Sequence, residues 1–194
     1  MKVRWILLMI VIFISCNKIP ENRENHRIEF LHRDVYLPLG YKKVSLESQL
    51  KKLRNKGKFS LAERLYSGRL QNIQKSNSKH VLFYDEKNTY NTISFMLGKL
   101  IPLQKKMVDM YTNMLEKEIF APTEKDGYTF EKLESELLYQ YKASSIKVKY
   151  EQKLGDEISY LTQYVITYKG QTFTIVVANE QNIDFEDILD NFDY

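Results

Sequence analysis

The chain has 194 residues, of which 43% are apolar, and this is enough for the core of one domain. It contains one cysteine, which excludes an intramolecular disulfide and a metal site built from several thiolates. The net charge of +4 is unevenly spread, because residues 18–79 carry 15 Lys and Arg against 6 Asp and Glu, whereas residues 80–194 carry 12 against 19.

The N-terminus has the three parts of an export signal. Lys2 and Arg4 supply positive charge, Trp5–Ile14 is an apolar run, and Ser15 is a small residue before Cys16. Ten helical residues span about 15 Å, roughly half of a ~30 Å hydrocarbon core, so a membrane-spanning helix of ordinary length is not expected there.

The sequence Phe13-Ile14-Ser15-Cys16 resembles the lipobox of bacterial lipoproteins. The resemblance covers only this N-terminal segment. It implies that a diacylglyceryl group is attached to the Cys16 thiol and that residues 1–15 are removed as a signal peptide. A thiolate is a good nucleophile for such a transfer, and two acyl chains give stable anchoring. A plain secretory signal with a chance cysteine, and an uncleaved N-terminal anchor, remain as alternatives.

The resemblance also implies a compartment. Asn17 follows the cysteine, and it is not the aspartate that retains lipoproteins at the inner membrane of Gram-negative bacteria. We therefore expect a lipid-anchored protein of the cell envelope, in the outer membrane and facing the periplasm. The expected partners are the membrane, through the lipid, and an envelope protein or glycan. Nucleic acid is not expected as a partner. The basic half either lies against anionic head groups or packs against the acidic half.

Residues 16–33 are polar and lack a lasting periodicity, so we expect a lipidated cysteine followed by a flexible tether. The end of this segment, Ile28 to Leu31, can join the fold. A single α+β domain is expected over residues 34–194, and residues 34–43 are expected to be an edge strand or an entry loop.

A basic helical hairpin is expected over residues 45–75. Ser45 can cap its first helix, and Lys56-Gly57-Lys58 separates the two helices. Ser60 and Glu63 fit a capping box at the start of the second helix.

Sheet and helices are expected over residues 80–194. The apolar patterns predict strands over residues 81–84, 90–97, 146–151, 158–168 and 172–178. Helices are predicted from Pro102 onward, over Phe130 to Tyr141 and over Phe185 to Phe192, the last with Asp184 as its cap.

The sum is an α+β fold, with an antiparallel sheet that ends in a three-strand meander and with helices packed on it. The order of the elements, together with Leu37-Pro38-Leu39-Gly40 near the start, is similar to that of the PsbP and Mog1 family. This resemblance implies an α/β/α sandwich as the alternative arrangement.

No catalytic residues, metal ligands or cofactors are predicted, because the sequence has no nucleophile elbow, Walker loop or metalloprotease motif. The histidines His26, His32 and His80 show no ligand spacing, and we expect them on the surface. The acidic residues near the C-terminus do not match a calcium loop, and the methionines after Pro102 are expected in the core.

Tyr160, Tyr164 and Tyr168 share one face of their predicted strand, so they are candidate ligand contacts, with a core role as the alternative. Asp85 and Glu86 are the best-placed carboxylate pair for acid–base chemistry, although a turn explains them more simply. The sequence therefore favours an envelope lipoprotein with a non-catalytic binding or structural domain. The alternative is a small envelope hydrolase that uses a carboxylate pair.

Overall fold

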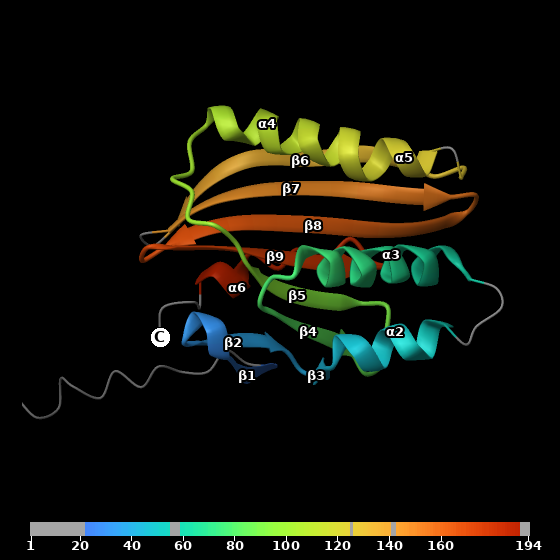
Figure 1. Cartoon of the computed structure of the whole chain (residues 1–194), viewed down its shortest axis with the longest axis horizontal. Coiled ribbons are helices and arrows are strands. Elements are labelled where there is room, and N and C mark those ends of the chain that lie inside the picture. The colour runs from blue at the N-terminus through green and yellow to red at the C-terminus, as the bar shows by residue number, and fades with distance from the viewer. Residues whose placement is uncertain (1–21, 55–58, 125, 141–142, 191–194) are drawn as a thin grey trace, which may run out of the picture.

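The computed structural model describes residues 22–54, 59–124, 126–140 and 143–190 (Figure 1). Its centre is a seven-stranded sheet in which every neighbouring pair is antiparallel. The order across the sheet is β3 (Tyr41–Val44), β4 (His80–Asp85), β5 (Thr92–Leu97), β9 (Gln171–Asn179), β8 (Glu157–Tyr168), β7 (Ala143–Leu154) and β6 (Thr129–Gln140).

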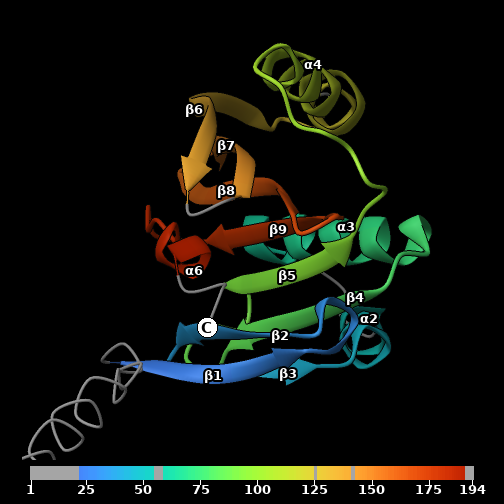
Figure 2. The same ribbon diagram turned by 90° about the vertical axis from the view of Figure 1, so that its left-hand side faces the viewer.

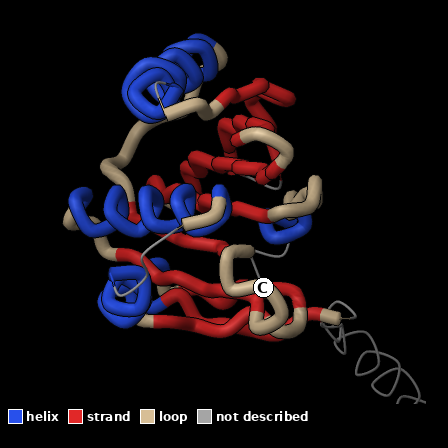
Figure 3. The backbone as a smooth tube through the Cα atoms, turned by 90° about the vertical axis from the view of Figure 1, so that its right-hand side faces the viewer, coloured by secondary structure: helices blue, strands red, loops and turns tan. Residues whose placement is uncertain are grey.

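Helices cover one face of this sheet. They are α2 (Leu46–Arg54), α3 (Leu61–Ser76), α4 (Lys106–Leu115), the π-helical turn η3 (Glu116–Phe120) and α5 (Ala121–Glu124). The other face is covered by the two-stranded sheet of β1 (Arg23–Ile28) and β2 (Arg33–Pro38), by the short helix η2 (Glu29–Leu31), and by α6 (Asp187–Asp190). Figures 2 and 3 show the two layers on opposite sides of the sheet.

The core follows from the period of two along each strand, since alternate side chains point to opposite faces. In β8, Tyr164 and Ile166 pack with the β1–β2 sheet and α6, whereas Leu161 and Val165 pack under α4. A third cluster joins α2 and α3 to the sheet, with Leu70 of α3 and Leu82 of β4 at its centre. These alternations confirm the predicted fold class, an α+β fold with an antiparallel sheet.

The predicted helical hairpin is confirmed. Ser60 accepts a hydrogen bond from the backbone of Glu63, and the Glu63 carboxylate accepts one from the backbone of Ser60, so the capping box forms as expected. The strands β4 and β5 and the C-terminal meander of β7, β8 and β9 are confirmed too, within a few residues at their ends.

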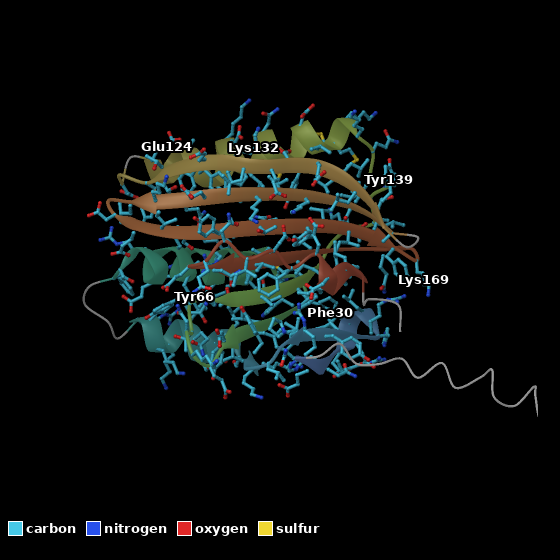
Figure 4. All side chains as sticks on the ribbon, turned by 180° about the vertical axis from the view of Figure 1, so that it is seen from behind. Phe30, Tyr66, Glu124, Lys132, Tyr139 and Lys169 are labelled. Carbon is cyan, nitrogen blue, oxygen red and sulfur yellow. The ribbon has the colours of Figure 1, made fainter. Side chains whose placement is uncertain are left out.

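The prediction of a helix over Phe130 to Tyr141 is wrong, because this segment is the edge strand β6. The strand pairs with β7 from Thr129 opposite Lys153 to Gln140 opposite Ala143, with a bulge between Lys132 and Glu134. Its Glu and Leu content favours a helix locally, and pairing with a distant segment overrides that preference. Figure 4 shows Lys132 and Tyr139 along this outer edge.

The expected tether is also corrected within residues 22–33. Arg23–Ile28 forms β1, which pairs with β2 over its whole length, and Glu29–Leu31 forms η2. Ile28 and Leu31 are buried in the core. The folded domain therefore includes residues 22–33, which precede the expected start at residue 34.

The remaining ends differ in smaller ways. The segment expected as one edge strand or entry loop is two strands, β2 and β3, joined through Gly40 at φ +94°. The terminal helix begins at Asp187, later than the predicted Phe185, and residues 191–194 lie outside the described residues, as does the whole lipobox. Over the described part of the chain, no helix has both the length and the apolar character needed to cross a membrane.

Candidate ligand-binding groove

A groove of about 650 Å³ lies on the helical face, between α3 and the η3–α5 segment. Its floor comes from β7 and β8, through Gln152 and Leu161. This volume is within the range of roughly 300–1,000 Å³ that is usual for small-molecule sites. Its lining is more apolar than polar, with aromatic side chains at Phe59, Phe120, Tyr128 and Phe130.

The capping box of α3 sets one wall of the groove, because it fixes where the helix begins. Glu63 of the box also accepts a hydrogen bond of 2.5 Å from the Tyr90 hydroxyl, which ties the first turn of α3 to the β4–β5 connection. One turn further on, Gly68 faces the groove, and a Cβ built there meets no atom within 4 Å. The groove is therefore open along the side of α3 that carries Gly68.

The opposite wall rests on a stack of aromatic rings. Phe120, at the end of η3, lies parallel to Phe130 of β6 with ring centroids 4.3 Å apart. It also meets the ring of Tyr150 of β7 edge-on at 4.5 Å. Phe120 is only 3% exposed, so this stack holds η3 and α5 at a fixed height above the sheet.

Arg69 is the most unusual residue that lines the groove. Its Nη2 atom donates a long hydrogen bond of 3.4 Å to the Tyr90 carbonyl. Its Nε and Nη1 atoms are shielded from solvent and have no hydrogen-bond partner among the described residues. Burial lowers the pKa of Arg69 to about 10, and Tyr66, whose ring lies 5.9 Å from the guanidinium, offsets only part of this shift. A buried guanidinium without a counter-ion is costly.

Gln152 adds a second unsatisfied group at the floor of the groove. Its side chain is buried, at 3% exposed, and its Oε1 atom has no partner among the described residues. An amide of this kind can donate through Nε2 and accept through Oε1. The groove thus combines an apolar lining with a cation and an amide that the rest of the domain does not satisfy.

A charged cluster lies on the other face of the sheet. Lys147 of β7 is 3% exposed and forms ion pairs with Glu134 of β6, with Asp184 at 2.7 Å and with Glu186. Burial alone would lower the pKa of Lys147, but hydrogen bonds to the three carboxylates outweigh it and raise the pKa. Burial likewise opposes ionisation of Asp184, but hydrogen bonds from Lys147 and Tyr164 lower its pKa to about 2.

This cluster explains the acidic residues before the C-terminus. Carboxylate oxygens of Glu134, Asp184 and Glu186 lie within 4.8 Å of one another, a spacing that fits a bound cation. The Lys147 ammonium pairs with all three and supplies that positive charge. Asp184, which we expected as the cap of the last helix, binds Lys147 and the Tyr164 hydroxyl instead. The cluster therefore fastens the segment before α6 to the sheet.

The tyrosine row is divided by burial. Tyr164 is 1% exposed and Tyr168 is 5% exposed, and both pack in the core beneath the β1–β2 sheet. Tyr160 is partly exposed, and its hydrogen bond with Glu151 raises its pKa. The three side chains share one face of β8, as predicted, but they do not form an exposed row, because only Tyr160 reaches the surface.

Asp85 and Glu86 follow β4 at a turn. The Asp85 carboxylate accepts a hydrogen bond of 2.9 Å from the Lys87 backbone, and Glu86 is exposed. Asp85 also lines a cleft of about 610 Å³ that Asp184 shares. The low pKa of Asp184 makes it a poor general acid or base at neutral pH.

The histidines and methionines are placed as follows. The His26 ring packs edge-on against Phe83 at 4.9 Å, and His80 Nδ1 lies 3.0 Å from the Ser78 carbonyl. His32 takes a left-handed backbone conformation at the end of η2. Met107 is partly buried and packs against the core, but Met110 is 61% exposed and Met114 is 38% exposed, so the expectation of methionines in the core is wrong for Met110 and Met114. Val108 and Leu115 form the buried face of α4 instead.

Sequence reasoning did not single out Arg69 or Gln152. Each occupies an ordinary position, Arg69 in a basic helix and Gln152 in a strand. Their lack of partners arises only when α3, η3 and β7 pack together, so no local sequence signal marks it.

No family model and no curated protein matches the chain. Among solved structures, the chain is similar to the solution structure of cyanobacterial PsbP (CyanoP) from Synechocystis sp. PCC 6803, at 15% sequence identity and a TM-score of 0.48, over 85% of each chain. We transfer no residue role and no activity from that protein.

Proposed function

We propose that this chain is a lipid-anchored protein of the bacterial cell envelope, and that its domain binds a ligand in the groove between α3 and α5 without transforming it. The anchor is the Cys16 thiol within Phe13-Ile14-Ser15-Cys16, which resembles a lipobox. The envelope location, in the outer membrane and facing the periplasm, is part of the same proposal.

The observation that carries the binding part is the pair of unsatisfied polar groups in the apolar groove. The Nε and Nη1 atoms of Arg69 and the Oε1 atom of Gln152 are buried without partners among the described residues, although buried polar groups are ordinarily hydrogen-bonded. Both side chains line the groove, so a ligand toward which they turned would satisfy these groups and recover part of the desolvation cost that the free domain carries.

The arrangement of the domain is compatible with anchoring. The first described strand, β1, lies on the face opposite the groove, and the helices that form the groove lie on the other side of the sheet (Figure 2). The N-terminal sheet that follows the anchor therefore does not cover the groove.

The hydrolase alternative has weaker support. Its best candidate carboxylate pair, Asp85 and Glu86, lies at a turn. The Asp85 carboxylate accepts a hydrogen bond from the backbone of that turn, and Glu86 is exposed. Asp184, which shares a cleft with Asp85, is held as a strong anion by Lys147 and Tyr164.

Filling the groove at Gly68 tests the binding proposal. The probe is the neutral dye N-phenyl-1-naphthylamine, and the protein is the chain from residue 16 to 194 with Cys16→Ala, which retains every described residue. We expect Gly68→Trp to weaken dye binding by about tenfold or more, because the indole occupies open space in the groove.

Gly68→Ala is the matched control. It adds one methyl group in the same open space, so dye binding should stay within about twofold. The same change should stabilise α3 by about 1 kcal/mol, since alanine is the better helix former. Dye binding that is equal in the wild type, Gly68→Ala and Gly68→Trp would contradict the proposal that the groove binds ligands.

A further inference from the structure

We infer that the ligand of the groove is a single-chain anionic amphiphile, with a carboxylate or phosphate head group at Arg69 and an apolar body along the aromatic lining. This inference rests on the proposed function, because it assigns a chemical class to the ligand of the same groove.

The charge of the head group follows from Arg69. The residue lines the groove, and its Nε and Nη1 atoms have no acceptor among the described residues. Both atoms are shielded from solvent, so a head group pairs with them when the side chain turns toward the groove. Within the described ranges no carboxylate forms an ion pair with it, and the only partner recorded for its donors is the Tyr90 carbonyl at 3.4 Å. A guanidinium binds carboxylates and phosphates through charge-assisted hydrogen bonds, which are stronger when water is excluded.

The exposed charges at the rim of the groove do not favour an anion over a cation. Arg64, Glu118 and Asp126 line the rim and are exposed, so both signs are present there. Exposed charges are screened by solvent and salt and contribute little to affinity. Selectivity for an anion therefore depends on the buried guanidinium of Arg69.

The apolar body follows from the rest of the lining. Leu161 forms the floor, Ile119 and Phe120 form one wall, and Leu65 lies on the opposite wall. Gly68 has no side chain, so the groove is open along this side of α3. A flexible alkyl chain fits an open groove of this kind, and each CH₂ group that it buries adds to its affinity.

The thermal stability of an Arg69 variant distinguishes a binding role of this residue from a structural role. Replacing a structurally paired arginine destabilises a protein, whereas replacing an unpaired buried cation removes a desolvation cost. We expect Arg69→Met to unfold at the same temperature as the wild type or at a higher one. A lower unfolding temperature would assign Arg69 to the structure of α3 and would overturn the inference.

The experiment measures displacement of N-phenyl-1-naphthylamine by four ten-carbon amphiphiles below their micelle concentrations. They are decanoate, decyl phosphate, decanol and decyltrimethylammonium. The protein is again the chain from residue 16 with Cys16→Ala. We expect both anions to bind at least about tenfold more tightly than decanol, and the cation to bind most weakly. Tighter binding of decanoate would indicate a free fatty acid, and tighter binding of decyl phosphate would indicate a phospholipid head group.

The variants are Arg69→Gln and Arg64→Gln. Arg69→Gln should weaken the two anions by roughly 30-fold and leave decanol unchanged. Arg64 lies on the same helix and lines the same groove, but it is exposed, so Arg64→Gln should stay within about threefold of the wild type. Equal binding of decanol and decanoate, or an unchanged Arg69→Gln variant, would overturn the inference while groove binding stands. Failure of every amphiphile to displace the dye, with no effect of Gly68→Trp, would overturn the proposed function itself.

Discussion

Replacing Lys147 by methionine should destabilise the domain by about 2–3 kcal/mol at neutral pH. The substitution removes the ammonium that pairs with all three carboxylates, those of Glu134, Asp184 and Glu186, whose oxygens lie within 4.8 Å of one another. Lys149 remains at 3.8 Å from Glu134 and 3.6 Å from Asp184, and it offsets part of their repulsion. The carboxylates are about one-third or more exposed, so water relieves part of the repulsion and the loss stays at the low end for a broken buried ion pair. Urea denaturation measures the loss.

Lys153→Met is the matched control. Lys153 lies on the same strand and pairs with Glu151, but its side chain is 41% exposed, so its removal should lower stability much less than removal of Lys147. Equal losses for the two variants would contradict the role given to the Lys147 cluster. Hydrogen exchange should also rise selectively in residues 184–190 of Lys147→Met, because this segment loses the Lys147 ion pairs and keeps only part of its attachment to the sheet, including the Tyr164 hydrogen bond.

The pH dependence gives a second check. In the wild type, the folded-state pKa of Asp184 is about 2, below its ordinary value of about 3.9, so its contribution to stability is present above that value and is lost as pH falls toward 2. In Lys147→Met, Asp184 loses the ammonium that lowers its pKa, so its pKa in the folded state rises. The difference in stability between variant and wild type should therefore shrink as pH falls from about 5 to 3.

Replacing Phe120 by alanine should cost about 3–5 kcal/mol and should abolish dye binding in the groove. The ring is 3% exposed, and its removal leaves a cavity between Phe130 and Tyr150, both of which contact it. The η3–α5 wall of the groove rests on this stack, so collapse into the cavity would move the wall. Urea denaturation and titration with N-phenyl-1-naphthylamine measure the two effects.

Two variants calibrate the Phe120 result. Met110→Ala changes an exposed residue of the neighbouring helix α4 and should alter stability by no more than about 0.5 kcal/mol. Phe120→Leu keeps most of the volume and should cost about 1–1.5 kcal/mol while it retains part of the dye binding. A loss below about 1 kcal/mol for Phe120→Ala would show that the aromatic stack does not support the wall.

The local signals in the sequence predict local structure well. Ser60 and Glu63 predict the start of α3, because both partners of a capping box lie within one turn of the helix. The meander of β7, β8 and β9 is also predictable, since its turns are short and each strand alternates in polarity.

Non-local pairing explains what could not be predicted. The strand β6 contains Glu131, Leu133, Glu134, Leu137 and Leu138, a composition typical of a helix, and its strand conformation depends on register with β7. Likewise, β1 lies in a polar stretch whose order comes from pairing with β2 and from burial of Ile28.

The candidate site depends wholly on tertiary packing. Arg69 and Gln152 are 83 positions apart in the chain, and only the packed structure shows that both line one groove and that both carry polar atoms without partners among the described residues. The role of Asp184 also depends on tertiary packing, because its partner Lys147 lies on the distant strand β7. By contrast, the anchor at Cys16 is predicted from adjacent residues alone.

The most direct test of the proposed envelope anchoring is the intact mass of the full chain after expression in a Gram-negative host and extraction from membranes, with Cys16→Ala beside it. The account predicts a mature chain that begins at Cys16 and carries the mass of its acyl groups, and it predicts that the variant loses both this mass and membrane retention. An unmodified wild-type chain that still carries Met1 to Ser15 would contradict it.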